Sequence, residues 1–419
     1  MRILKQKDTK TRVPVCKKSR KIAVHILKFI TFDFSRMPVG NRIFGVKIKI
    51  VLSVIFISFL EIGFLKVTWA KDFHWGIHAR PWPQAESIFH TDPYWLGGDG
   101  ASSIYLGDER ILWLFGDTFI GTGPSRNRRN ACIIRNSIGM QQGKNPTESD
   151  IAFAWEKSDE KPSAFFPGRE NQWLWPGSGI RLYNTLFIFF MVIEKSPNAL
   201  GFDVAGWKAA MVINPDKSPQ DWHMQWLRNP DIHHRLIVGT GSVVSEGNYV
   251  YTCAVDSLTH RVYLLRWPSK SFLKGNLSNS QWWSKQEWID YTATDPLPSF
   301  IFQTGAMEFS IHYNSSIRKY IQIESGPLDD PKLFFRTAPA ITGAWSAGRP
   351  FFLPEESKDD TLLIYAGKAH PSLSGANPAI SYVVNAKDFN RLLSDQDIYY
   401  PRMLKGSIEK IFLSSVPLQ

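Results

Sequence analysis

Cysteine is scarce in this sequence, and its scarcity excludes several ways of stabilising a fold. The chain has 3 cysteines in 419 residues, and only Cys132 and Cys253 follow the first 70 residues. Two thiols make at most one disulfide, in an oxidising compartment, and do not make a disulfide framework. Neither thiol belongs to a CxxC pair, so no zinc site is predicted. No cofactor is expected, and a structural Ca²⁺ is left open.

Long apolar runs are missing as well. Residues 50–60 (IVLSVIFISFL) form an apolar run of 11 residues, whereas a membrane-spanning helix needs about 20. Basic residues precede this run and VTWA follows it at 67–70, which is typical of a secretory signal with a cleavage point. Residues 1–70 are therefore predicted to be a leader, either a cleaved signal peptide or an uncleaved signal anchor. The remaining chain is expected to be secreted, periplasmic or anchored at the cell surface, with membrane contact only through the leader.

The body of the chain lacks an excess of charge of either sign. The net charge of +11 comes from residues 1–70, which hold 15 Lys or Arg and 3 acidic residues. Residues 71–419 hold 34 basic and 35 acidic side chains. A nearly neutral body has no general polyanion-binding surface, so nucleic acid is not a predicted partner.

The body contains one theme that is repeated along the chain. An apolar strand, a polar turn and a second apolar strand are followed by a third short strand and a polar stretch with a tryptophan. The hairpins start near residues 103, 180, 242 and 309, and a fifth, less regular copy comprises FFLP, TLLIYAG and ISYVVN. The recurring tryptophans, predicted to pack between repeats, are Trp155, Trp222, Trp282 and Trp345. Helical patterning is weak and confined to the region near 386–396.

The second strand of each hairpin indicates how the repeats are arranged. ILWLF and LFIFFMVI are apolar on both faces, whereas a strand of a two-layer sandwich alternates. A strand held between two neighbouring sheets does not alternate. Five sheets of about four strands in a radial arrangement satisfy this pattern, so residues 71–419 are predicted to form a single all-β domain, a five-bladed β-propeller. A large β-sandwich or two β domains is the alternative.

One hairpin carries two aspartates at its open end, one before the first strand and one after the second. Residues 97–118 read GGDGASSIYLGDERILWLFGDT. The turn near Gly107 pairs residues whose numbers add up to 216 or 217, which places Asp99 opposite Asp117 or Thr118. Two carboxyl groups held together against apolar walls push their pKa values apart, as an acid and base require. The alternative is that each aspartate only forms a turn.

Other polar and aromatic residues are expected around the same axis. Glu308, at the start of the fourth repeat, is a third candidate carboxylate, or else a cap on backbone amides. Rings that stack on sugars and polar groups that bind hydroxyls are predicted at the ends of the inner strands. These candidate substrate-binding residues are Trp175, Arg135, Asn136, Ser178, Tyr365 and His370.

Several of these stretches resemble a family of bacterial secreted β-propellers. The family was long catalogued as a domain of unknown function and has endo-D-arabinanase members. The resemblance spans roughly residues 90–390 and rests on GGDGASSIYL, LWLFGDT, RNSIG, WPGSG, EFSIHYN and YAGKAHP. It implies a fold similar to the five-bladed arabinanase, xylosidase and invertase glycosidases, with Asp99, Asp117 and, less directly, Glu308 as catalytic acids. WPGSGIRL lacks the acid that better-known propeller glycosidases carry on their second inner strand, so their three-carboxylate plan does not transfer whole.

The sequence thus predicts a monomeric glycoside hydrolase, and the resemblance implies that its substrate is a furanoside-type polysaccharide such as arabinan. A carboxyl separation of about 5 Å would predict retention of configuration, and about 6.5–9.5 Å inversion. The alternative is a non-catalytic propeller that binds carbohydrate or another partner with the same aromatic pocket.

Overall fold

The computed structural model describes residues 73–123, 126–198 and 201–412, which belong to one compact unit. The predicted leader, residues 1–70, lies outside the described residues. Within this part of the chain, no helix is long and apolar enough to cross a membrane. The unit is all-β, with three short α-helices: α3 (Pro83–Glu86), α4 (Ser269–Phe272) and α5 (Phe389–Ser394). Four 3-10 turns complete the described helices: Ser87–His90, Arg128–Asn130, Pro219–Asp221 and Glu355–Lys358.

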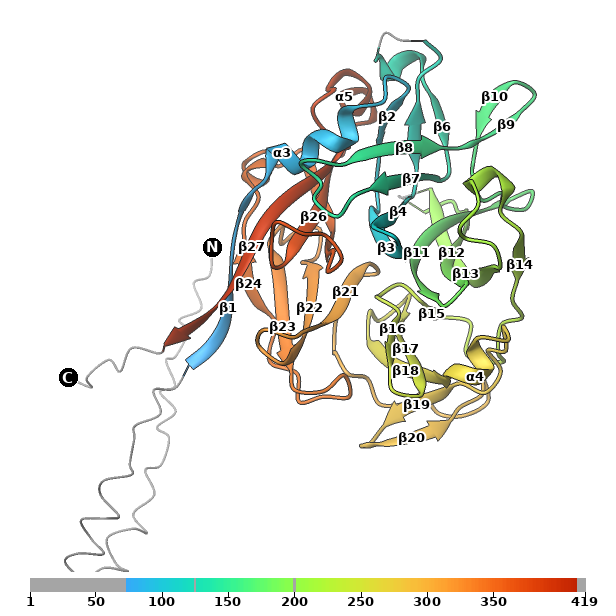
Figure 1. The fold of residues 1–419 in the computed structure, drawn as a ribbon, viewed down its shortest axis with the longest axis vertical. Helices are drawn as coiled ribbons and strands as arrows, with labels where there is room; N and C mark the ends of the chain where they lie inside the picture. The colour runs from blue at the N-terminus through green and yellow to red at the C-terminus, as the bar shows by residue number, and fades with distance from the viewer. Residues whose placement is uncertain (1–72, 124–125, 199–200, 413–419) are drawn as a thin grey trace, which may run out of the picture. The chain divides into compact units, whose positions relative to one another are not determined.

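Five sheets of four or more strands follow one another along the described chain, and Figure 1 shows them around a common centre. The first comprises β3 (Ser102–Gly107), β4 (Arg110–Phe115), β7 (Ser137–Gln142) and β8 (Asp150–Ala154). The second comprises β11 (Gln172–Leu182), β12 (Thr185–Lys195), β13 (Phe202–Val212) and β14 (Met224–Trp226). The third comprises β15 (Leu236–Val238), β16 (Val244–Glu246), β17 (Tyr249–Asp256), β18 (Val262–Pro268), β19 (Gln281–Ser284) and β20 (Glu287–Asp290).

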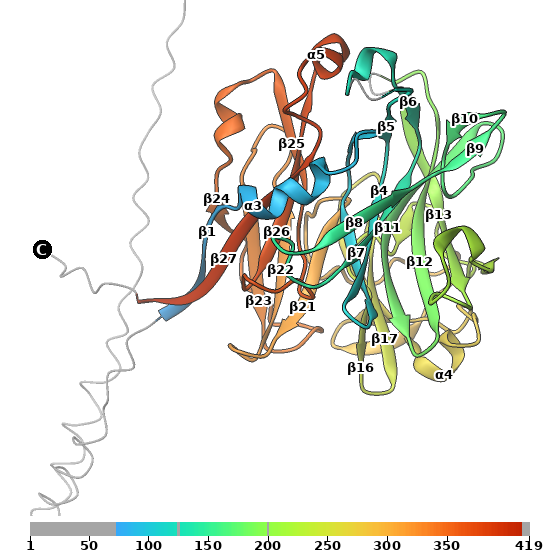
Figure 2. The same ribbon diagram turned by 45° about the horizontal axis from the view of Figure 1, so that its top comes forward.

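The two remaining large sheets complete the series. The fourth comprises β21 (Phe309–Asn314), β22 (Lys319–Ser325), β23 (Leu333–Ala338) and β24 (Arg349–Phe352). The fifth comprises β25 (Leu362–Ala369), β26 (Ala379–Ala386), β27 (Pro401–Phe412) and β1 (Phe73–Pro81). Two small sheets lie beside the first: β2 (Trp95–Gly98), β5 (Thr118–Ile120) and β6 (Cys132–Ile134), and the hairpin of β9 (Glu156–Ser158) and β10 (Lys161–Ser163). Figure 2 shows the same strands from a second direction.

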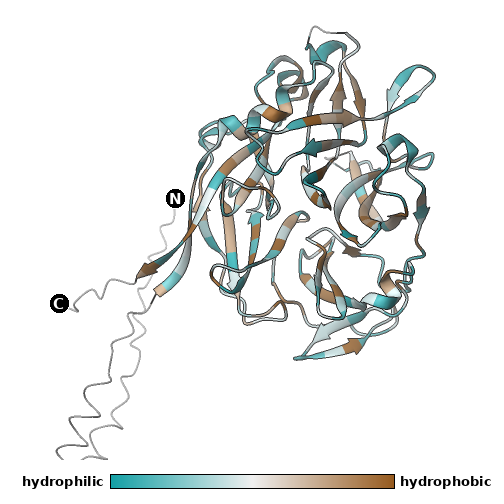
Figure 3. Ribbon diagram, viewed as in Figure 1, coloured by the Kyte–Doolittle hydropathy of each residue, from teal (hydrophilic) through white to brown (hydrophobic). Residues whose placement is uncertain are grey.

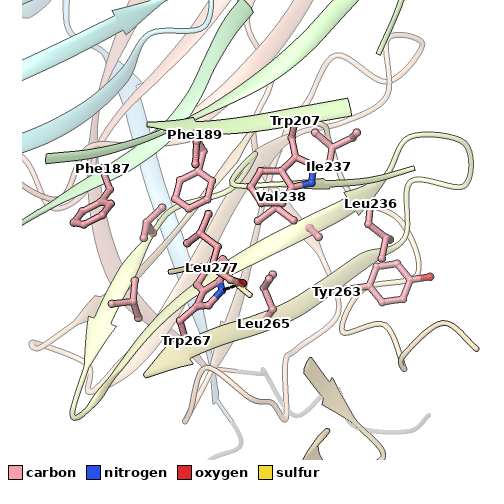
Figure 4. Packing of buried hydrophobic residues seen from close by; sticks show 14 of the residues in the cluster. Phe187, Phe189, Trp207, Leu236, Ile237, Val238, Tyr263, Leu265, Trp267 and Leu277 are labelled. Atoms are coloured by element: carbon pink, nitrogen blue, oxygen red, sulfur yellow. Dashed lines mark hydrogen bonds between the residues drawn. The ribbon is translucent and has the colours of Figure 1, made fainter. Parts of the chain in front are cut away.

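Strands that are apolar on both faces lie between two sheets, as the sequence predicts. Along β12, Leu186 and Ile188 pack in a cluster with the first sheet. The alternate residues Phe187 and Phe189 pack against the third sheet, where the Trp267 indole donates a hydrogen bond of 2.9 Å to the carbonyl of Leu277 (Figure 4). Burying a side chain of this size contributes roughly 1.5–3 kcal/mol, so each face of β12 stabilises one junction.

Each of five hydrophobic clusters joins two successive sheets. One of them joins the fifth sheet to the first, through Ala379 and Met403 on one side and Trp113 on the other. The start and end of the unit also meet in the fifth sheet, where β1 pairs with β27 from Phe73↔Phe412 onward. Figure 3 shows hydrophobic residues concentrated on the strands. The recurring tryptophans lie in these clusters as predicted, with Trp282 fully buried.

One expectation needs correction, and one open question is answered. FFLP does not begin the fifth repeat, because β24 pairs with β23 and so is the outer strand of the fourth sheet. Cys132 and Cys253 are free thiols and do not form the disulfide that an oxidising compartment would permit. The weak helical signal near 386–396 corresponds to α5.

Candidate active site

Asp99 and Asp117 face each other at the open end of the first hairpin. The strands β3 and β4 pair with residue numbers that add up to 216, as in Ser102↔Leu114, which confirms the predicted register. The same register continues past the strand ends, where the Asp99 N–H donates to the Asp117 carbonyl over 3.3 Å. A Cβ on Gly116 would lie 2.4 Å from Asp99 Oδ1. The glycine of FGDT therefore leaves room for the Asp99 carboxyl group.

Two phenols hold the Asp99 carboxyl group. Asp99 Oδ2 accepts hydrogen bonds from the Tyr365 hydroxyl at 2.9 Å and the Tyr399 hydroxyl at 3.2 Å. The Tyr399 hydroxyl also lies 3.1 Å from the main-chain oxygen of Asp117, so one side chain contacts both aspartates. Among the described residues, no cation makes an ion pair with Asp99. Asp99 is thus held by neutral donors alone.

Asp117 has a different set of partners. Its Oδ1 accepts from the Trp175 indole nitrogen at 2.9 Å, and its Oδ2 accepts from Arg135 Nη1 at 3.0 Å. The Arg135 guanidinium lies 4.3 Å from the centre of the Trp173 ring, which fixes its direction. Both donors favour the ionised form of Asp117.

These surroundings make the two carboxyl groups unequal. Burial, followed by the charges of Asp117 and Glu308, raises the pKa of Asp99 to about 8, against the two tyrosines, which lower it. Burial also raises the pKa of Asp117, but Arg135 and Trp175 oppose that rise. Asp99 therefore carries a proton at neutral pH, whereas Asp117 has the partners that a carboxylate needs.

Glu308, the third predicted carboxylate, forms an ion pair near Asp99. Glu308 precedes β21, and its Oε1 lies 2.8 Å from Lys368 Nζ. The Lys368 side chain is only 5% exposed, and Nζ also donates to the Gly100 carbonyl over 2.5 Å. The structure thus brings Glu308 to the same site, with a cation bound to it.

The other predicted residues occupy different places around the site. Asn136 is fully buried, and its Nδ2 donates to the carbonyls of Phe166 and Leu174, both at 2.9 Å. His370 is fully buried between the hydroxyls of Ser103 and Ser381, at 2.8 and 2.7 Å. The polar atoms of both side chains are therefore hydrogen-bonded to other buried groups of the protein.

Burial is the main cause of a low pKa of about 3 at His370, so its imidazole is neutral. Ser178 is half-buried where the pairing of β11 with β12 breaks between Pro176 and Gly179. Trp175 and Tyr365, predicted to stack on sugars, donate hydrogen bonds from their polar atoms to Asp117 and Asp99.

Two residues of the site were missed by sequence reasoning. Tyr399 precedes β27 in a left-handed conformation with φ of 65°, and no local pattern marks it as a partner of Asp99. Lys368 interrupts an apolar strand, and this was a usable signal because lysine is seldom fully buried without a partner. Within the described residues, no group of three or more His, Cys, Asp or Glu side chains is arranged to hold a metal ion.

A family model described as "Domain of unknown function (DUF5005)" matches residues 84–405, which is well over half of the sequence. The chain belongs to this family. No curated protein matches it.

Solved structures of similar fold include hydrolases. A candidate hydrolase from Bacteroides ovatus matches with a TM-score of 0.64 at 17% identity, covering 79% of this chain and 90% of that one. At this identity the similarity shows the fold alone. A GH62 α-L-arabinofuranosidase from Coprinopsis cinerea matches at 10% identity and a TM-score of 0.42, over 80% and 96% of the chains. An exo-β-1,3-galactanase from Phanerochaete chrysosporium matches at 11% and 0.42, over 76% and 61%. These two similarities are too slight to carry an argument.

Proposed function

We propose that this member of the family is a glycoside hydrolase that acts on a furanoside-type polysaccharide such as arabinan, outside the cytoplasm. The observation that carries the proposal is the unequal pair of Asp99 and Asp117. One carboxyl group is held by two phenols, and the other is held by an arginine and an indole. Environments that move the pKa values of two adjacent carboxyl groups apart in this way suit an acid paired with a base or nucleophile.

The arrangement of the sheets supports a β-propeller of five blades. Each hydrophobic cluster lies between sheets that follow one another, and the last cluster returns from the fifth sheet to the first. Asp99, Glu308 and Lys368 come from the first, fourth and fifth sheets or their entry loops and still meet. Such a meeting point lies at the centre of a propeller, where these folds bind ligands.

In the reaction, Asp99 gives its proton to the oxygen of the leaving sugar as the bond from that oxygen to the anomeric carbon breaks. Asp117 either takes a proton from an attacking water or bonds to the anomeric carbon, which water then releases. The Asp99 proton sits on Oδ1, because Oδ2 already accepts from Tyr365 and Tyr399. Asp99 Oδ1 is therefore the atom that donates to the substrate.

The second candidate function is a carbohydrate-binding propeller without turnover. The exposed part of the site favours sugar contact in either case, because the Arg135 side chain is 43% exposed beside the Trp173 ring. In that function the aspartates only orient hydroxyl groups, so replacing one would alter affinity modestly.

The test is release of reducing ends by the full chain from a polysaccharide panel that includes arabinogalactan and other arabinans. We expect Asp99→Asn and Asp117→Asn to lower the rate by about 10²–10⁴-fold. Asp108→Asn is the matched control, because Asp108 lies in the turn of the same hairpin with a 92% exposed side chain. Binding to a glycan without release of reducing ends by the wild type would favour the second function.

A further inference from the structure

The strand β25 carries two residues that reach the same place, although their spacing predicts the opposite. Tyr365 contacts Asp99, and Lys368 contacts Gly100, the next residue along the chain. In a regular strand, side chains three positions apart point to opposite faces. Something in the backbone between Tyr365 and Lys368 must therefore reverse the alternation.

A β-bulge makes that reversal. Tyr365 pairs with Val383 and Lys368 with Ser381, so three steps along β25 match two along β26. The extra residue is accommodated at Ala366, whose φ of 57° is left-handed and rarely adopted by a non-glycine residue. Bulges of this kind re-aim side chains beside functional sites.

Close packing fixes the bulge in place. A Cβ on Gly367 would lie 2.7 Å from Ser325 Oγ and 2.9 Å from the Ser325 amide nitrogen. The Gly367 N–H donates to Ser325 Oγ over 2.7 Å, and the next-but-one N–H, of Ala369, donates to Ser310 Oγ over 2.7 Å. The bulge is therefore anchored on both sides by hydroxyls of the fourth sheet.

We propose that the Tyr365–Lys368 segment is a positioning element of the active site, in which Tyr365 holds Asp99 and Lys368 holds Glu308. The bulge presents the phenol and the ammonium side by side. Lys368 binds the Glu308 carboxylate and the Gly100 carbonyl at once, so it ties the third carboxylate to the backbone that carries Asp99. The negative charge of Glu308 acts on Asp99, and the positive charge of Lys368 partly offsets that effect.

Other charged or titratable groups near Asp99 also influence its pKa. Asp117 follows β4 and raises the pKa of Asp99, as does Glu308. Tyr365 and Tyr399 lower it through their hydrogen bonds. Arg135 forms its ion pair with Asp117 and not with Asp99. A change at Lys368 should therefore reach Asp99 by way of Glu308.

The test is a direct titration of Asp99 in the full chain, which depends on no enzymatic turnover. Aspartate labelled with ¹³C at the carboxyl carbon reports the titration midpoint, and Asp99→Asn identifies its signal. We expect Glu308→Gln to lower the midpoint, because a like charge is removed. We expect Lys368→Met to raise it by roughly half a unit or more, because the Glu308 charge loses its counter-ion. The double variant should lose the rise and match Glu308→Gln.

Two further variants make the outcome decisive. Lys358→Met removes the lysine of an exposed ion pair with Glu355 and should leave the midpoint unchanged. Gly367→Ala disturbs the bulge without removing a charge, and should move the midpoint in the direction of Lys368→Met. It decides the case if Lys368→Met does not fold. An unchanged midpoint in Lys368→Met, or an equal rise in the double variant, would overturn the proposal.

The inference rests on the proposed function only in taking Asp99 as the acid. If the titration behaves as expected but no glycan is cleaved, the positioning element stands and the hydrolase proposal fails. If glycans are cleaved but the titration midpoint of Asp99 is unchanged in Lys368→Met, the hydrolase proposal stands and the positioning element fails.

Discussion

The main-chain N–H of Asp99 donates to the main-chain carbonyl of Asp117 over 3.3 Å, so the two candidate catalytic residues share one point of the backbone ladder. Their separation is set by strand pairing and not by flexible side chains alone. Small changes next to this point should therefore alter the reaction more than they alter the fold.

Gly116→Ala tests that dependence. The new Cβ would stand 2.4 Å from Asp99 Oδ1, the atom proposed to donate the proton, so the carboxyl group must move. We expect kcat/KM to fall by about 10²-fold, as for a misplaced catalytic group. The melting temperature should change little. Gly123→Ala is the control, since a Cβ there meets nothing within 4 Å. Equal effects in both variants would contradict the expectation.

Tyr399→Phe should shift the pH dependence of the reaction. The Tyr399 hydroxyl lowers the pKa of Asp99 by a hydrogen bond, so its removal raises that pKa above about 8. Because the acid must be protonated, the decline of kcat/KM at alkaline pH should begin at higher pH than in the wild type. Tyr365→Phe should act in the same direction. A pH–rate profile measures this, and a shift toward acid would refute it.

Asp99→Asn should stabilise the protein at neutral pH even as it slows the reaction. The pKa of Asp99 is about 8 in the folded protein, and its ordinary value is 3.8. Between these values the folded state binds the proton more tightly than the unfolded state, so wild-type stability falls as pH rises. The asparagine does not titrate and escapes this loss. Thermal unfolding should show an advantage for the variant of at least about 2 °C that grows from pH 4 to pH 8.

Arg128→Met should destabilise the fold strongly, although Arg128 touches neither aspartate. The side chain is 1% exposed and donates to main-chain carbonyls of Leu96, Leu392, Asp395 and Ile398, at 2.5–3.2 Å. Those carbonyls lie on β2 and in the stretch from α5 to Ile398, just before Tyr399, and the variant leaves them unsatisfied. We expect a loss of about 3–5 kcal/mol by chemical denaturation. The exposed neighbour Arg129→Met should cost under about 0.5 kcal/mol.

Much of the fold could be predicted because its signals are local. The strands follow from apolar runs between turns, and β12 shows on both faces the apolar residues that two neighbouring sheets require. Turn geometry also fixed the register that places Asp99 opposite Asp117. The boundary between the fourth and fifth repeats was misplaced, because FFLP comes after the tryptophan that was taken to end the fourth repeat. Only the pairing of β24 with β23 shows that this strand belongs to the fourth sheet.

The sequence by itself determined the strands, the hairpin register and the two aspartates, since each depends on residues close together in the chain. Only the tertiary structure decided what surrounds them. Tyr365, Lys368 and Tyr399 reach Asp99 or its neighbour Gly100 across about 270–300 positions of the chain, because the fifth sheet packs against the first. Burial, which places Asn136 inside the wall and raises the pKa of Asp99, is likewise a property of all the packed sheets together and of no single segment.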